Sequence, residues 1–164
     1  MARKFRKFDR KDGFSEKNLL QYGIDHLRTS KHLFEYSPIC YDSAGYLSHI
    51  GIELIFKAWH LHIFNFFNGD HCLERLYNKI IDKYSYKQLP KKHLTTLFLL
   101  DEFEELRYPS PNKSIEIGSD DFIKIEELSL CLLKKMPKKF IKVYSEISII
   151  NKGGRVLMEK PIKN

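Results

Sequence analysis

Hydrophobic residues recur every three or four positions along most of this chain, and polar or turn-forming residues separate the periodic stretches. A period near 3.6 predicts amphipathic α-helices. Glycine and proline are scarce, at 8 and 6 of 164 residues, which argues against a turn-rich β-sandwich and against a disordered chain. We therefore predict an all-α fold with helices at residues 16–36, 42–67, 72–83, 90–107 and 120–136.

The second predicted helix is apolar over most of its circumference. Its hydrophobic residues form two adjacent stripes: Leu47, Ile50, Leu54, Ala58 and Leu61 in one, and Phe56, Trp59, Ile63 and Phe67 in the other. Such a helix normally lies at the centre of a bundle. A membrane span would need about 20 mainly apolar residues. Five polar residues interrupt this stretch, so we predict a core helix and no membrane contact: Glu53, Lys57, His60, His62 and Asn65.

Residues with capping or helix-breaking chemistry indicate where the first two helices begin and end. Ser15 should cap the first helix, and Asp42 or Ser43 the second, because their side chains accept hydrogen bonds from free backbone N–H groups. Gly69 is expected to end the second helix in a left-handed conformation.

The C-terminal part of the chain is less regular. Ser119 or Asp120 should cap the last helix, and Pro137 should kink or end it. The hydrophobic spacing then allows the helix to resume over residues 140–150. Residues 155–158 fit a short extended segment.

The net charge of +7 is concentrated at the two ends of the chain. Residues 1–12 carry +4 and residues 134–164 carry +7, so the body between them carries −4. Basic ends either bind nucleic acid by neutralising its phosphates or simply solvate the chain. Phe5 and Phe8 lie within the first basic segment, where they could stack on bases or dock on the body.

The length suits one domain with a sizeable core. We expect a basic arm at residues 1–14, a helical domain at residues 15–150 and a tail at residues 151–164.

The cysteines and histidines do not predict a disulfide or a metal site. Cys40, Cys72 and Cys131 are odd in number and far apart, so we expect free thiols in a reducing cytoplasm. His60 and His62 stand two apart, and such residues point about 200° from each other around a helix. No phosphate-loop motif is apparent, so neither a metal nor a cofactor is expected.

Three motifs follow one another along the predicted helices. Glu53 stands two positions after the small residue Gly51 and has Lys57-Ala58 four positions later; residues 71–77 then read His-x-Leu-x-x-Leu-Tyr, and residues 106–109 read Leu-Arg-Tyr-Pro. Together these motifs resemble the HEPN (higher-eukaryote and prokaryote nucleotide-binding) family over residues 16–150. The resemblance implies a four- or five-helix bundle, often dimeric. It also implies RNA or nucleotide chemistry, in toxin–antitoxin pairs or in defence against foreign nucleic acid.

The chain departs from the ribonucleases of that family, which carry an Arg followed four to six residues later by a His. No His follows Arg107 in that window. A metal-independent ribonuclease needs a base, and His is best suited at neutral pH. We therefore expect a non-catalytic or diverged domain that binds nucleic acid or a nucleotide. Two alternatives stay open: a ribonuclease toxin in which folding brings His71 or His93 to Arg107, and a protein–protein interaction module.

Five residues make up the candidate binding site. Glu53 and Lys57 stand in the order that favours a helical ion pair, and they either pair structurally or flank a polar pocket. His71 is expected to cap or order the third helix. Arg107 beside Tyr108 either presents a rigid fork to phosphate or forms a buried salt bridge with Glu53. The carboxylates before Arg107 are expected to form a solvated face: Asp101, Glu102, Glu104 and Glu105.

Overall fold

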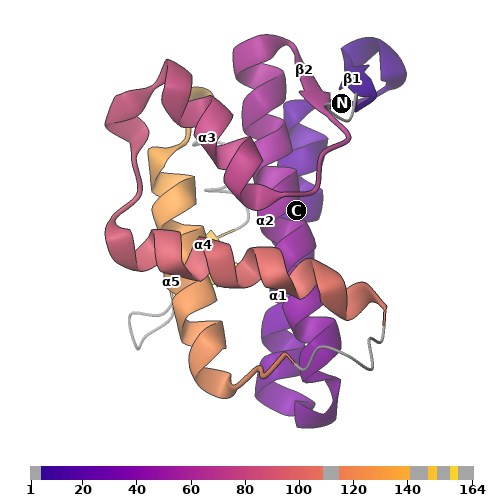
Figure 1. Ribbon diagram of the computed structural model, residues 1–164, viewed down its shortest axis with the longest axis vertical. Helices are drawn as coiled ribbons and strands as arrows, with labels where there is room; N and C mark the ends of the chain where they lie inside the picture. The colour runs from indigo at the N-terminus through magenta and orange to yellow at the C-terminus, as the bar shows by residue number, and fades with distance from the viewer. Residues whose placement is uncertain (1–4, 109–114, 141–147, 151–155, 159–164) are drawn as a thin grey trace, which may run out of the picture.

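The computed structural model describes residues 5–108, 115–140, 148–150 and 156–158. It is an all-α bundle, as the hydrophobic period predicted (Figure 1). The α-helices are α1 (Glu16–Tyr36), α2 (Tyr41–Phe64), α3 (Leu73–Lys83), α4 (Lys91–Glu102) and α5 (Ser119–Lys135). Short 3-10 helices are η1 (Arg10–Asp12), η2 (Pro38–Cys40), η3 (Ser85–Lys87), η4 (Phe103–Arg107) and η5 (Lys138–Phe140). Two antiparallel ribbons pair β1 (Lys7–Asp9) with β2 (Phe66–Asn68), and β3 (Ser148–Ile150) with β4 (Val156–Met158).

The two long helices α1 and α2 lie side by side, and α4 runs across the bundle from α5 towards them (Figure 1). The buried residues of α2 surround its whole axis, which confirms that this helix is central. On α1, Lys31 interrupts the apolar stripe, and its ammonium group lies 2.7 Å from the carboxylate of Glu126 on α5. No described helix is long and apolar enough to cross a membrane.

Small residues let α1 and α2 approach closely. A Cβ added to Gly23 would lie 2.8 Å from the carbonyl oxygen of Gly51. Further along the same seam, the Ser30 hydroxyl lies 2.8 Å from the carbonyl oxygen of Ala44 and 2.6 Å from the hydroxyl of Ser48. Both hydroxyls are therefore buried with hydrogen-bond partners, as buried polar groups require.

The ends of α2 differ from those predicted. The helix begins at Tyr41, so Asp42 and Ser43 lie inside it, and no side chain caps its first turn. It ends at Phe64, where Asn65 takes the left-handed conformation, with φ of 63°. Asn tolerates this conformation better than most residues. The prediction that Gly69 ends this helix was therefore wrong, because α2 already ends before β2, and Gly69 follows β2.

The C-terminal prediction was correct in part. Helix α5 begins at Ser119 with Gly118 as its N-cap residue, so neither Ser119 nor Asp120 caps it. The carboxylate of Asp121 accepts the backbone N–H of Gly118 at 3.0 Å. The expected helix over residues 140–150 is wrong at residues 148–150, which form β3, while residues 141–147 lie outside the described residues. The extended segment is confirmed at residues 156–158.

The N-terminal segment docks on the bundle through β1. Phe8 stacks on Phe67, with ring centroids 5.5 Å apart, and meets Phe14 edge-on at 5.6 Å. Ser15 caps α1 as predicted, since its hydroxyl accepts the N–H of Asn18 at 3.1 Å. Phe8 could have stacked on bases or docked on the body of the protein, and the structure shows it docked on the body.

Candidate functional site

A buried carboxylate in the middle of α2 organises the most polar part of the interior. Glu53 is only 6% exposed, and three cationic or titratable side chains surround it. Its Oε1 accepts a hydrogen bond from the Lys57 ammonium at 2.5 Å. Its Oε2 lies 3.1 Å from His71 Nδ1 and 3.5 Å from His49 Nε2. The structure thus brings together three predicted site residues, Glu53, Lys57 and His71, and adds His49.

These neighbours keep Glu53 ionised. Burial by itself raises the pKa of a carboxyl group. The interaction with His49, followed by the charge and hydrogen bond of Lys57 and the charge of His71, reverses that effect and lowers the pKa of Glu53 to about 2. At neutral pH the group is therefore a carboxylate that can only accept hydrogen bonds.

His49 ties α2 to α4 beneath this carboxylate. Its Nδ1 lies 2.8 Å from the carbonyl oxygen of Leu100, so Nδ1 must donate its proton there. Its Nε2 is buried and forms no hydrogen bond with any described residue, although Glu53 Oε2 faces it. Burial opposes protonation, but Glu53 and the Leu100 carbonyl outweigh it and raise the pKa of His49. The charged form of the ring is therefore favoured more than in a free histidine, because both ring nitrogens face acceptors.

His71 is the member of this cluster that reaches solvent. Its side chain is 50% exposed, whereas that of Glu53 is 8% exposed. Because the Glu53 carboxylate can only accept, His71 Nδ1 carries the hydrogen of the bond between them. In the neutral imidazole, Nε2 then holds a free lone pair, which is the arrangement of a general base oriented by a buried acid.

The start of α3 is capped by α4 and not by His71. The Asp101 carboxylate accepts the backbone N–H of Leu73 at 2.6 Å and that of Glu74 at 2.9 Å. Of the two roles expected for His71, capping the third helix was therefore wrong. The prediction of a solvated acidic run was wrong for Asp101 as well, while Glu102 and Glu105 are exposed.

Next to this cap, an ion pair between a buried carboxylate and an exposed guanidinium holds the chain before α3. Asp70 is 1% exposed and accepts two hydrogen bonds from the Arg75 guanidinium, at 2.6 and 2.8 Å. Burial by itself would raise the pKa of Asp70, but Arg75 and the N–H of Cys72 lower it. Burial, with Asp101 nearby, raises the pKa of the Cys72 thiol, which makes it a poor nucleophile.

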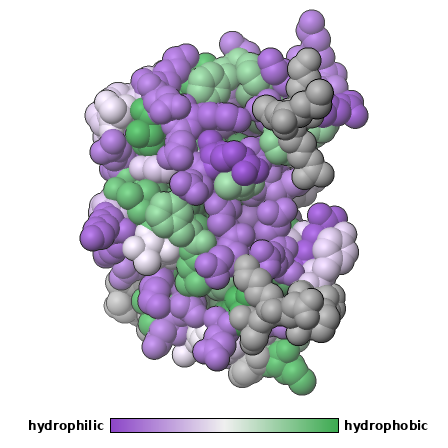
Figure 2. Space-filling model, viewed as in Figure 1, coloured by the Kyte–Doolittle hydropathy of each residue, from purple (hydrophilic) through white to green (hydrophobic). Residues whose placement is uncertain are grey.

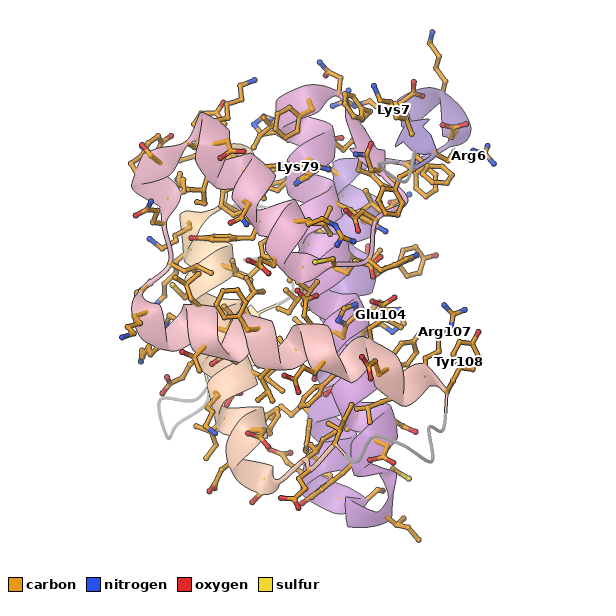
Figure 3. All side chains as sticks on the ribbon, viewed as in Figure 1. Arg6, Lys7, Lys79, Glu104, Arg107 and Tyr108 are labelled. Atoms are coloured by element: carbon orange, nitrogen blue, oxygen red, sulfur yellow. The ribbon has the colours of Figure 1, made fainter. Side chains whose placement is uncertain are left out.

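Arg107 and Tyr108 occupy a different place, at the end of η4, where both side chains point away from the bundle (Figure 3). Both residues are exposed, Tyr108 by 69%. The guanidinium carbon lies 5.3 Å from the Tyr108 ring centroid. No carboxylate pairs with Arg107 in the described part of the chain, and Glu53 has the partners given above. Of the two roles left open for Arg107, the buried salt bridge with Glu53 was therefore wrong.

Sequence reasoning did not select His49 or Asp101 as site residues. His49 stands four positions before Glu53, on the same helix face, and this spacing was an available signal. Asp101 gave no local signal, because it caps a helix that begins 28 residues earlier. Among the described residues, no group of three or more His, Cys, Asp or Glu side chains is placed to hold a metal ion.

The fold and the site together describe an all-α bundle in which a buried carboxylate lies between imidazole and ammonium groups. Comparison of the chain with protein-family models, with curated proteins and with solved structures found no match.

Proposed function

We propose that the protein is a HEPN-like domain that binds RNA or a nucleotide, with Arg107 and Tyr108 as the principal contacts. The observation that carries this proposal is the state of Arg107. It is exposed, lies against an exposed aromatic ring and has no carboxylate partner among the described residues. A planar guanidinium can bind a phosphate through two parallel hydrogen bonds, and a tyrosine ring can stack on a base.

The distribution of charge supports the same proposal. The first twelve residues carry +4, and Arg6 and Lys7 within them lie beside the β1–β2 ribbon (Figure 3). The Arg6 guanidinium lies 4.9 Å from the Phe8 ring centroid, and the Lys7 ammonium 4.4 Å from that of Phe66. Neither of these cations forms an ion pair with a described residue. Both can therefore add phosphate contacts without first breaking a salt bridge.

The test is a gel-shift titration of labelled mixed-sequence RNA at about 50 mM salt, where phosphate contacts are strong. We expect binding, and we expect Arg107→Ala to weaken it about tenfold or more, because charge-assisted hydrogen bonds are lost. Arg107→Lys should recover only part of the loss, since lysine lacks the planar fork. Lys17→Ala is the matched control, because it removes one exposed positive charge from α1.

Two outcomes would overturn the proposal. One is that the wild-type protein binds neither RNA nor a nucleotide under these conditions. The other is that Arg107→Ala binds as tightly as Lys17→Ala.

A second candidate function, RNA cleavage, is favoured by the contact between His71 and Glu53. A half-exposed imidazole whose Nδ1 is held by a buried carboxylate can take a proton from a ribose 2′-hydroxyl through Nε2. The same RNA should then yield products ending in a 2′,3′-cyclic phosphate. His71→Gln should slow cleavage by about 100-fold or more, and His32→Gln, an exposed histidine on α1, should not. A wild-type protein that leaves RNA intact would eliminate this candidate.

A further inference from the structure

A cavity lies between the end of α2, the strand β2 and the end of α3, separate from both sets of residues described above. Its volume is about 410 Å³, within the range of about 300–1,000 Å³ typical of small-molecule sites. Seven residues line it: His60, Phe64, Phe66, Asn68, Lys79, Asp82 and Lys83. Figure 2 shows hydrophobic side chains over the end of α2, at the top of the molecule, bordered by hydrophilic ones.

Two aromatic rings form the apolar part of the lining. The centroids of Phe64 and Phe66 lie 6.3 Å apart with the ring planes tilted by 45°. Both rings are partly exposed, unlike the fully buried Phe56 of the core. Partly exposed, rigid rings at the wall of a cavity are suited to contact with a flat aromatic molecule.

Lysine ammonium groups surround these rings. Lys83 Nζ lies 5.3 Å from the Phe64 centroid, and Lys7 Nζ lies 4.4 Å from the Phe66 centroid. Lys79 lines the cavity from the preceding turn of α3 (Figure 3). None of the three forms an ion pair with a described residue. Asp82 also lines the cavity, but the two lysines of the lining outnumber it, so the site keeps an excess of positive charge.

The neutral polar groups of the lining are not available to a ligand. The Asn68 Oδ1 is buried out of reach of solvent. The His60 Nε2 donates to the carbonyl oxygen of Leu76 at 2.8 Å. The lysine ammonium groups are therefore the main polar contacts left for a ligand.

We propose that this cavity binds a small aromatic anion, that is, a planar ring carrying a carboxylate or phosphate. The ring contacts Phe64 and Phe66, and the anionic group lies between Lys79 and Lys83. This site is independent of the RNA contacts assigned to Arg107.

The probe is 2-aminobenzoate, which has the ring and the anion in one small molecule. It is titrated into the isotopically labelled full-length protein while amide resonances are followed by nuclear magnetic resonance. We expect saturable shifts at residues 64–68 and 79–83 below about 10 mM. Aniline lacks the anion, so it should bind more weakly. Adenosine monophosphate in a separate titration tells whether the phosphate-bearing members of the class bind as well.

Variants locate the contacts. The double variant Lys79→Gln with Lys83→Gln should weaken 2-aminobenzoate at least about tenfold, because it removes the charged partners. Lys87→Gln with Lys91→Gln changes the charge equally outside the cavity and should have little effect.

The inference is overturned if 2-aminobenzoate produces no saturable shifts at the lining residues, or if the cavity and control double variants bind it equally. Its failure can be separated from that of the proposed function. Arg107→Ala should leave the 2-aminobenzoate titration unchanged, and RNA binding that persists without any aromatic-anion binding would refute the cavity alone.

Discussion

Gly51 on α2 lies directly against Gly23 on α1, so the two longest helices touch through their backbones. A Cβ on Gly51 would lie 2.9 Å from the Gly23 carbonyl oxygen and 2.7 Å from Leu27 Cγ. Neither glycine has a positive φ. The requirement is therefore one of space and not of backbone conformation.

Gly51→Ala should destabilise the protein by about 1–3 kcal/mol, since overpacking forces a shift of backbone or core side chains. The free energy of unfolding is measured by urea titration. Ser43→Ala is the control, because it places an alanine at an exposed position of the same helix. A Gly51→Ala protein as stable as Ser43→Ala would show that the helices do not meet at this point.

Asp101→Ala should destabilise the protein by about 1–2 kcal/mol, because two backbone N–H groups at the start of α3 lose their acceptor. The neighbouring exposed Glu102→Ala removes the same charge without affecting the cap. Urea unfolding of the two variants side by side measures the difference. Amide hydrogen exchange of Leu73 and Glu74 should also become faster in Asp101→Ala alone; equal exchange in both variants would contradict the capping role.

Glu53→Gln should destabilise the protein by about 3–5 kcal/mol, because it leaves the buried Lys57 ammonium without its counter-charge. Lys57 is only 6% exposed, so solvent cannot replace the lost partner. Adding Lys57→Met to Glu53→Gln should recover part of the loss, since it removes the unpaired charge. If the double variant is no more stable than Glu53→Gln, the ion pair is not the reason for the loss.

His60 should make the protein less stable as the pH falls below neutrality. Burial lowers the pKa of His60 to about 4 from its ordinary value of 6.5, despite the opposing hydrogen bond to Leu76. Between these two values the unfolded chain binds a proton that the folded chain does not, so stability is lost as the pH falls. A shift of this size corresponds to about 3 kcal/mol.

The check on His60 is the slope of unfolding free energy against pH between about pH 4 and 6.5. His60→Gln should flatten that slope, whatever its effect on stability at neutral pH. His32→Gln, on the exposed side of α1, should keep the wild-type slope. An unchanged slope in His60→Gln would mean that its imidazole titrates normally in the folded protein.

Much of the helical framework could be predicted from local patterns. The bounds of α1 and its Ser15 cap were predicted correctly, because a 3.6-residue period and a capping hydroxyl act within one turn of the chain. The central position of α2 followed from its two apolar stripes. The pairing of Glu53 with Lys57 was one of the structural alternatives, and their four-residue spacing permits it on any regular helix.

The site depended on contacts that no local pattern encodes. His71 was singled out, but its hydrogen bond to Glu53 joins residues 18 positions apart, and Asp101 caps a helix from another element. A salt bridge with Glu53 was one of two roles left open for Arg107, and η4 leaves Arg107 at the surface.

The sequence by itself determined where helices form and which of their faces are apolar, because backbone hydrogen bonding and side-chain period are properties of neighbouring residues. Only the tertiary structure decided which polar groups meet. That outcome depends on how closely α1, α2 and α4 approach, and the space around Gly23 and Gly51 sets the approach of the first two.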